Sequence, residues 1–214
     1  MGHRGKLGGA LVLTVLLLGC LAVSYSFSWY REDLRSSFNI ILQANTTTTI
    51  DYFWTKTRTT VDTVTSLGGA TSSHTQQSEN DYTDEQKDVK QVFTISLSFL
   101  TASAAAALAL AVFQIIGIIS RSRFFRILSG IAGLASFALL AVAFFQFFGI
   151  TKALDKDNQC GGYIGLDNSP CESFFGSTEG VLGLKFRWFP FIGWWVGVGG
   201  LAFSLLSAVA SFLA

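Results

Sequence analysis

Four long stretches of this sequence contain no Asp, Glu, Lys or Arg, and they limit most strongly how the chain can fold. They are residues 7–30, 91–120, 127–151 and 188–214. A helix needs about 20 predominantly apolar residues to cross the hydrocarbon core of a bilayer. Each stretch meets that length, so the sequence predicts an integral, multi-pass membrane protein with four spans.

The overall composition favours the same class of protein. Half of the 214 residues are hydrophobic and 14% are charged, whereas soluble domains have about 25% charged residues. The net charge is +1, and the few basic residues form no concentrated basic face, so a nucleic-acid partner is not expected.

The basic residues predict the orientation of the spans, because Lys and Arg near a span are retained in the cytosol. Arg4 and Lys6 precede the first stretch, and Arg121, Arg123 and Arg126 separate the second from the third, without an acid in either place. Two crossings separate these places, so both termini are predicted to be cytosolic, in the plasma membrane or an endomembrane. The predicted segments are a cytosolic N-terminus (1–6), the first span (7–30), an extracellular or lumenal first loop (31–90), the second span (91–120), a cytosolic turn (121–126), the third span (127–151), an extracellular or lumenal second loop (152–187) and the fourth span (188–214).

The first stretch has an alternative interpretation as a cleavable signal peptide. A basic start, an apolar run at residues 11–18 and the small residues Ser24 and Ser26 fit that class of segment, and cleavage would leave three spans. The uninterrupted length through Trp29 and Tyr30, an aromatic pair suited to a membrane interface, favours retention.

The first loop changes character along its length. Residues 45–67 are rich in Thr, Val, Ile and aromatic residues, which predicts strands. Residues 68–86 are small and polar and predict a flexible tip that contains His74. The expected fold class is therefore an all-α transmembrane four-helix bundle with a small extracellular or lumenal β-rich first loop, in which neither loop forms a separate domain.

Three local patterns in the loops carry further predictions. Thr83 with Gln86 is typical of a capping box, so the second helix is expected to begin before the second span. Asn45 begins an Asn-Thr-Thr triplet, which is a glycosylation acceptor in such a loop, although many such triplets stay unmodified. Cys160 and Cys171 predict a disulfide that closes the second loop, because a metal site would need further Cys or His ligands nearby.

The predicted spans contain small and uncharged polar residues suited to helix packing, and no reactive groups. No span contains a charge, and no catalytic, cofactor-binding or metal-binding motif is found, so an enzyme is not expected. Gln114 and Gln146 fit interhelical hydrogen bonds better than a permeation path. Gly193 and Gly197 form a small-xxx-small pair that serves either packing within the bundle or a dimer face.

Four spans, a long strand-like first loop, a tight basic turn and a shorter second loop together resemble the claudin and peripheral-myelin-protein group of four-span proteins. In that group the first loop carries a Trp, a Gly-Leu-Trp stretch and a pair of bridged cysteines. Here Trp29 and the "YFW" that ends at Trp54 stand in for the tryptophans, and both first-loop cysteines are missing. The resemblance therefore rests on layout and not on motif.

These observations favour a non-enzymatic membrane protein that acts as a structural, interaction or accessory subunit through its loops. The expected partners are the lipid bilayer and neighbouring membrane proteins or further copies of the chain, with no cofactor. Trp29, Trp54, Gly193 and Gly197 are the candidate interaction residues. The alternative is an oligomeric channel or pore-forming subunit, to which several copies would contribute the path.

Overall fold

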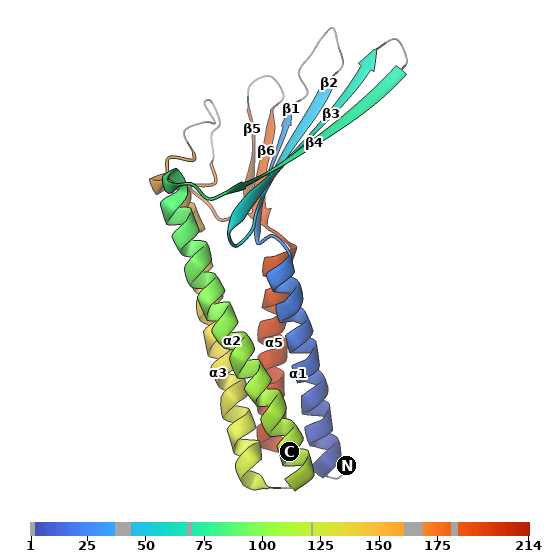
Figure 1. Cartoon of the computed structure of the whole chain (residues 1–214), viewed down its shortest axis with the longest axis vertical. Helices are drawn as coiled ribbons and strands as arrows, with labels where there is room; N and C mark the ends of the chain where they lie inside the picture. The colour runs from blue at the N-terminus through green and yellow to red at the C-terminus, as the bar shows by residue number, and fades with distance from the viewer. Residues whose placement is uncertain (1–2, 37–43, 68–69, 121, 161–168, 181–183) are drawn as a thin grey trace. The chain divides into compact units, whose positions relative to one another are not determined.

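The computed structural model describes residues 3–36, 44–67, 70–120, 122–160, 169–180 and 184–214. Arg121 of the predicted turn, residues 68–69 of the predicted tip and residues 161–168 of the second loop lie outside the described residues. The chain forms two compact units (Figure 1). The helical unit comprises Met1–Phe27, Ile95–Phe147 and Ile192–Ala214, and the sheet unit comprises Ser28–Thr94 and Phe148–Phe191.

Four helices match the four charge-free stretches. They are α1 (His3–Ser26), α2 (Lys87–Ser120), α3 (Arg123–Phe147) and α5 (Ile192–Leu213), and the four helical stretches of the described chain are long and apolar enough to cross a membrane. The prediction of four possible spans is confirmed. The early start of the second helix is confirmed as well, because the one-turn 3₁₀ helix η1 (Asp84–Gln86) leads directly into α2.

The buried positions of these helices repeat at alternating intervals of three and four residues. An average period of 3.5 residues keeps one narrow stripe of each helix facing its neighbours and produces a left-handed twist of the helices around one another. Small residues occupy most of the stripe on α5, which lets other helices approach its backbone closely. The stripe positions are Leu7, Ala10, Thr14, Leu17, Leu21 and Ser24 on α1; Ser96, Leu100, Ser103, Ala107, Leu110, Gln114 and Gly117 on α2; Ser129, Gly133, Ser136, Leu140, Ala143 and Phe147 on α3; and Gly193, Gly197, Gly200, Ser204, Ser207 and Ser211 on α5.

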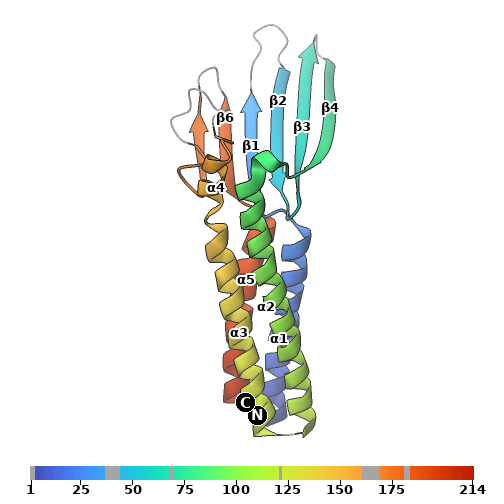
Figure 2. The same cartoon turned by 60° about the vertical axis from the view of Figure 1, so that its left-hand side comes forward.

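The most extensive backbone contacts within the helical unit are those of α5 with α1 and with α3. Both cartoon views show the first turn of α1, the last turn of α5 and the α2–α3 turn at one end of the unit (Figures 1 and 2). Contacts agree with this placement, since Lys6 lies beside Leu213 and Gly117 lies beside Leu7. We call this end of the helical unit the arginine end, because Arg123 and Arg126 begin α3 there.

The sheet unit overturns the predicted fold class. A six-stranded antiparallel sheet forms the unit, in the order β4-β3-β2-β1-β6-β5. The prediction of an all-α bundle with a small β-rich first loop is wrong, because the sheet is a substantial domain built from both connecting segments. Its strands are β1 (Tyr30–Ser36), β2 (Ala44–Tyr52), β3 (Lys56–Leu67), β4 (Ala70–Asp81), β5 (Gly176–Glu179) and β6 (Lys185–Pro190), and a short helix α4 (Ile150–Lys156) belongs to the same unit.

One local prediction about the loops is wrong, and one feature of the sheet was not predicted, for separate physical reasons. The predicted flexible tip forms β4, which pairs with β3 from Lys56↔Asp81 to Leu67↔Ala70. An edge strand exposed on both faces needs no apolar alternation, so its composition gives little sign of a strand. Strands β5 and β6 come from the second loop, where β6 pairs with β1, and such a pairing of residues far apart in sequence cannot be seen in a local pattern.

The two faces of the sheet differ in chemistry, because successive side chains of a strand point to opposite faces. One face buries large side chains near the centre of the sheet, and the other carries most of the charges. The first face includes Tyr30, Glu32, Tyr52, Phe186 and Trp188, all at most 4% exposed, and the second includes Arg31, Asp33, Asp51, Arg58, Glu79, Lys185 and Arg187.

Candidate functional site

Strand β4 is the candidate interaction surface of the sheet unit. It lies at the edge of the sheet and pairs only with β3 among the described residues. Every side chain from Thr71 to Asp81 is exposed, and residues 71–78 contain no Asp, Glu, Lys, Arg or Pro. The opposite edge strand, β5, has four residues, whereas β4 has twelve.

Charge is concentrated at one end of the β3–β4 pair. Glu79 accepts hydrogen bonds from Lys56 and from Arg58, whose Nε lies 2.9 Å from Glu79 Oε1. These hydrogen bonds hold the pKa of the Glu79 carboxyl below its usual value. Further along the strand, Thr75 donates to Asp62 Oδ1 at 2.6 Å. His74, predicted to lie in the flexible tip, is an exposed residue of β4 opposite Thr63.

The two candidate tryptophans of the first loop lie together inside the sheet unit. Trp29 is 1% exposed, its ring centroid lies 4.6 Å from that of Trp54, and Trp54 lies edge-on to Phe93 at 6.1 Å. Trp29 thus contributes to the core of the unit and offers no surface to a partner. The aromatic cluster continues to Tyr82, whose ring stacks on Phe93.

Tyr82 ties this cluster to the backbone. Its hydroxyl donates a 2.7 Å hydrogen bond to the carbonyl oxygen of Phe53, and the residue is 6% exposed. Burial raises the pKa of Tyr82 well above its usual value.

A partly buried ion pair joins β1 and β2. Arg31 donates from Nε and Nη2 to the two carboxylate oxygens of Asp51 at 2.7 and 2.8 Å, and Ser28 donates to Asp51 Oδ1 at 3.0 Å. The Arg31 guanidinium also lies 3.5 Å above the ring centroid of Phe191. This forked geometry is the strong form of an Arg–carboxylate contact, and it fixes the place where the chain enters the sheet.

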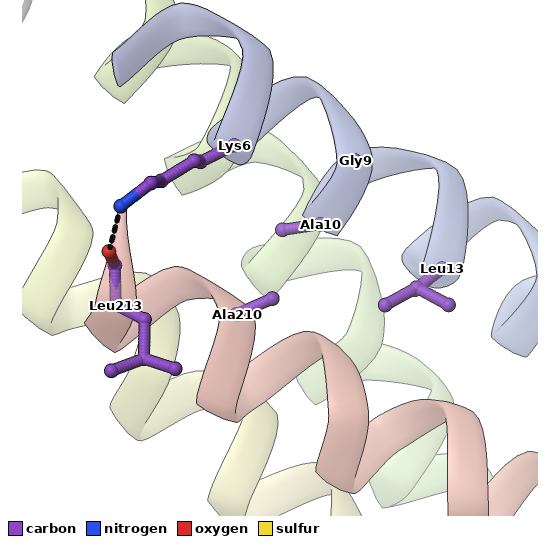
Figure 3. Close-up of a pocket in the computed structure, with 6 residues that line it drawn as sticks. All are labelled: Lys6, Gly9, Ala10, Leu13, Ala210 and Leu213. Atoms are coloured by element: carbon purple, nitrogen blue, oxygen red, sulfur yellow. Dashed lines mark hydrogen bonds between the residues drawn. The ribbon is translucent and has the colours of Figure 1, made fainter. Parts of the chain in front are cut away.

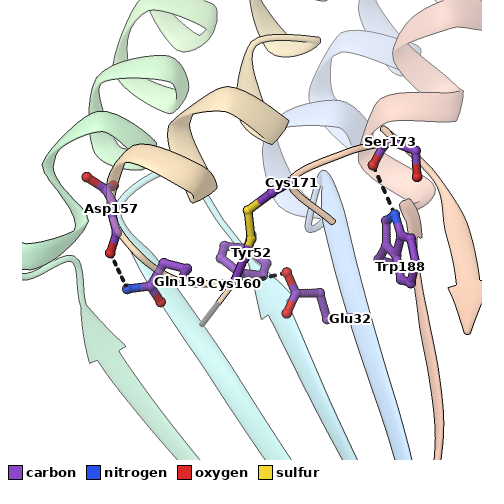
Figure 4. The surroundings of a disulfide bond; sticks show 8 residues. All are labelled: Glu32, Tyr52, Asp157, Gln159, Cys160, Cys171, Ser173 and Trp188. Atoms are coloured by element: carbon purple, nitrogen blue, oxygen red, sulfur yellow. Dashed lines mark hydrogen bonds between the residues drawn. A yellow bond between two sulfur atoms is a disulfide. The ribbon is translucent and has the colours of Figure 1, made fainter. Parts of the chain in front are cut away.

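The second connecting segment forms the predicted disulfide. Cys160 and Cys171 are bonded, with their Cα atoms 6.3 Å apart (Figure 4). Nearby, Trp188 Nε1 donates to the carbonyl oxygen of Ser173 at 2.9 Å, and Tyr52 donates to the buried carboxylate of Glu32 at 3.2 Å. The bridge therefore lies beside the buried face of the sheet.

Asp157, which precedes the disulfide, caps helix α2. The backbone N–H groups of Asp88 and Val89 donate to its two carboxylate oxygens at 3.1 and 2.8 Å. A carboxylate there satisfies unpaired N–H groups and complements the positive end of the helix dipole. The capping box predicted at Thr83 does not form, because the Thr83 side chain makes no capping hydrogen bond. The sequence could not reveal a cap supplied from 69 residues away.

A chain of neutral polar side chains lies inside the helical unit. Gln114, fully buried on α2, accepts from Thr14 at 2.8 Å and donates to Ser207 at 2.9 Å and Ser211 at 3.0 Å. The hydroxyl oxygens of Thr14 and Ser207 are in turn 2.7 Å apart, and each lies 3.1 Å from the carbonyl oxygen of Ala10, which is a further acceptor for the hydroxyl protons. We call Thr14, Gln114, Ser207 and Ser211 the polar seam. Gln146, the second predicted interhelical residue, is exposed on α3.

The predicted small-residue pair lies inside the same unit. Gly193 and Gly197 are both buried on α5, and a Cβ on Gly197 would come within 2.6 Å of Phe144 Cζ and 3.1 Å of Ser24 Oγ. The structure therefore uses Gly197 for packing within the bundle. Sequence reasoning found this pair but missed Thr14, Ser207 and Ser211, although a 3.5-residue count of small polar residues along each span could have found them.

Two hollows flank the last turn of α5 at the arginine end. One, of about 560 Å³, is lined mainly by apolar residues of α1 and α5 and has Lys6 at its end, where Lys6 Nζ lies 3.4 Å from the carbonyl oxygen of Leu213 (Figure 3). The other, of about 320 Å³, is lined by Arg123, Arg126, Ile127 and Phe212.

The described residues contain no group of His, Cys, Asp and Glu side chains that could hold a metal ion. A scan against protein-family models and a search of curated proteins find no match to this chain. Function therefore has to be argued from the surfaces described above.

Proposed function

We propose that this chain is a non-enzymatic four-span membrane protein that acts as a structural, interaction or accessory subunit, and that β4 is the strand through which it joins a neighbouring protein. The single observation that carries the proposal is the exposed, uncharged edge of β4 between Thr71 and Ser78. An extended segment of a neighbour would add to the sheet there by backbone hydrogen bonding.

The edge of β4 lacks the features by which proteins normally prevent such pairing. Edge strands are usually short, charged, bulged or interrupted by proline. Strand β4 has twelve residues, pairs with β3 in unbroken register, and has its first carboxylate at Glu79. The other edge is protected by its shortness, because β5 has four residues. Pairing is therefore expected on one edge of the sheet.

The orientation proposed with this function follows the basic residues. Both termini and the α2–α3 turn are cytosolic, and the sheet unit is extracellular or lumenal, in the plasma membrane or an endomembrane. The disulfide supports this side for the sheet unit, because such bonds persist in oxidising compartments. Asn45 is exposed at the start of β2, which makes it the proposed glycosylation site.

A claudin-like membership remains part of the proposal. The four helices and the strands of the first connecting segment support it, and the missing cysteine pair of the first loop counts against a close relationship. The alternative of an oligomeric channel or pore-forming subunit loses the support of Gln114, because Gln114 is engaged with Thr14, Ser207 and Ser211 inside the bundle.

Two proline substitutions test the β4 edge. Alternate residues of an edge strand direct their N–H groups toward the neighbouring strand and toward the free edge. Of Gln76→Pro and Gln77→Pro, one therefore removes a hydrogen bond to β3 and the other removes only a free-edge donor. We expect the variant that removes only a free-edge donor to keep the wild-type thermal unfolding midpoint. The same variant should lose most of the crosslinked assembly seen in native membranes.

The matched control is Ser177→Pro on the opposite edge strand, which we expect to leave the crosslinked assembly intact. Mass analysis of the crosslinked product then identifies either a second copy of the chain or a different protein. The proposal is wrong if the wild-type chain crosslinks to nothing, or if both β4 variants fold and assemble as the wild type does.

A further inference from the structure

The smaller hollow at the arginine end combines two cations with an apolar wall. It lies between the start of α3 and the last turn of α5, with Arg123 and Arg126 on one side and Phe212 on the other, and its volume is about 320 Å³. Ile127 completes the lining. A guanidinium beside aromatic and aliphatic surface suits a ligand that has both an anionic and an apolar part.

No acidic side chain of the helical unit neutralises the positive charge of this hollow. The three segments of that unit contain no Asp or Glu. Among the described residues neither Arg123 nor Arg126 takes part in an ion pair. An anion bound in the hollow would neutralise the two guanidinium groups.

Arg126 gives the second, independent sign of a ligand. Its Nε–H is buried and has no hydrogen-bond acceptor among the described residues. A buried donor without an acceptor is destabilising, and more so when the group is charged. The donor belongs to a side chain that lines the hollow, so a ligand oxygen that reaches Nε from the hollow would supply the missing acceptor.

The local backbone adds to the same preference. Helix α3 begins at Arg123, and the first N–H groups of a helix carry a partial positive charge that favours phosphate. Arginines at the end of a membrane-spanning helix also lie at the depth of the lipid headgroups. A phosphorylated lipid fits all three features, namely the two arginines, the start of α3 and the apolar wall of the hollow.

We infer that the Arg123–Arg126 hollow binds the phosphomonoester headgroup of an anionic phospholipid. A phosphomonoester carries a charge of about −1.5 to −2 at neutral pH, which balances two guanidinium groups, whereas a phosphodiester headgroup carries a single negative charge. The planar donor fork of arginine matches phosphate oxygens in a bidentate arrangement. Phe212 and Ile127 then contact the start of the acyl chains.

The hollow beside Lys6 serves as an internal comparison. Lys6 lies at the same end of the helical unit, but it is exposed and its Nζ already has an acceptor at Leu213. A cation there attracts anionic lipid in general and forms no defined phosphate site. Lys6→Gln therefore removes one charge without altering the proposed site.

The test uses the full chain in a neutral detergent, titrated with phosphatidic acid, with bound lipids counted by native mass spectrometry. We expect one phosphatidic acid to bind, and phosphatidylglycerol with the same acyl chains to bind more weakly. Arg126→Gln and Arg123→Gln should each weaken binding of phosphatidic acid by about tenfold or more, as expected for loss of a hydrogen bond to a charged group. Arg126→Lys should weaken it too, because an ammonium keeps the charge but lacks the Nε donor. Lys6→Gln should leave it unchanged.

Several results would overturn the inference. Equal binding by wild type and Arg126→Gln would remove the site, and an equal loss in Lys6→Gln would show general electrostatic attraction. Displacement of the lipid by inorganic phosphate at matching concentration would assign the site to free phosphate instead. If Arg126→Gln does not fold, Arg123→Gln decides alone, because the Arg123 side chain is exposed.

Discussion

At the residue scale, one amide holds together the polar interior of the helical unit. Gln114 bonds to residues of two other helices, Thr14 on α1 and Ser207 and Ser211 on α5. In hydrocarbon such side chains act as interhelical contacts worth about 0.6–2 kcal/mol. The sequence predicted this role for Gln114 because an uncharged span leaves an amide few other partners.

Replacing this amide should loosen the bundle moderately. We expect Gln114→Leu to lower the free energy of unfolding by about 1 kcal/mol, since Thr14 and Ser207 still reach the carbonyl oxygen of Ala10. Gln146→Leu is the matched control, because Gln146 is exposed on α3, and it should change stability by less than about 0.5 kcal/mol. Denaturant unfolding in mixed micelles measures both, and equal effects would contradict the assigned role of the polar seam.

Tyr82 predicts how the sheet unit responds to alkali. Its burial raises the pKa of the phenol in the folded chain above the unfolded value near 10. The stability linked to this group is therefore fully present below pH 10 and is lost as the pH rises from there through the folded pKa. Tyr82→Phe loses the hydrogen bond to Phe53 at every pH but has no phenol to ionise.

The measurement compares wild type with Tyr82→Phe at neutral and alkaline pH. At neutral pH the variant should be less stable by about 1 kcal/mol, and this difference should shrink as the pH rises above 10. Urea midpoints of the sheet unit, followed by tryptophan fluorescence, give both values. Parallel loss of stability in the two proteins would contradict the prediction.

At the element scale, helices and strands differed in how far sequence could predict them. The four helices follow from charge-free length alone, which is a local property. Strand β4 was missed because its Ser, Gln and Asn side chains lie exposed on both faces, and β6 was missed because its partner, β1, lies more than 150 residues earlier. The candidate site on β4 was missed as well, because it could not be recognised without the strand that forms it.

The close packing of α5 against α3 requires a residue without a side chain at Gly133. A Cβ on Gly133 would lie 2.8 Å from Ala208 Cβ and 3.0 Å from Ala208 Cα, so backbone atoms would have to move. We expect Gly133→Ala to destabilise the helical unit by about 1–3 kcal/mol. Gly199→Ala on α5 meets nothing within 4 Å and should be neutral or slightly stabilising, because alanine favours the helix. Thermal unfolding in detergent distinguishes the two, and a Gly199→Ala variant that is less stable than Gly133→Ala would contradict the packing.

At the scale of the whole molecule, each unit is assembled from segments far apart in the chain. The helical unit takes three segments and the sheet unit two, so the sheet cannot form until the second connecting segment has been made. The orientation of the four helices therefore decides the compartment in which β4, the disulfide and the Arg123–Arg126 hollow operate. The connections that build the sheet unit and the α2–α3 turn lie on opposite sides of a membrane only if α2 and α3 both cross it.

Single cysteines should show the two sides directly. In a chain with Cys20 replaced by Ala, we expect Ser78→Cys on β4 to react with a membrane-impermeant maleimide in intact cells, or in vesicles whose lumen is open to the reagent. Ser122→Cys, in the α2–α3 turn, should react only after the cytosolic side is exposed, because arginines beside a span favour the cytosolic side. An Asn45→Gln variant examined in parallel should lose a glycan-dependent mobility shift in a eukaryotic host. Reaction of both cysteines from one side would mean that an even number of crossings separates them, and the proposed lumenal or extracellular sheet unit would then be untenable.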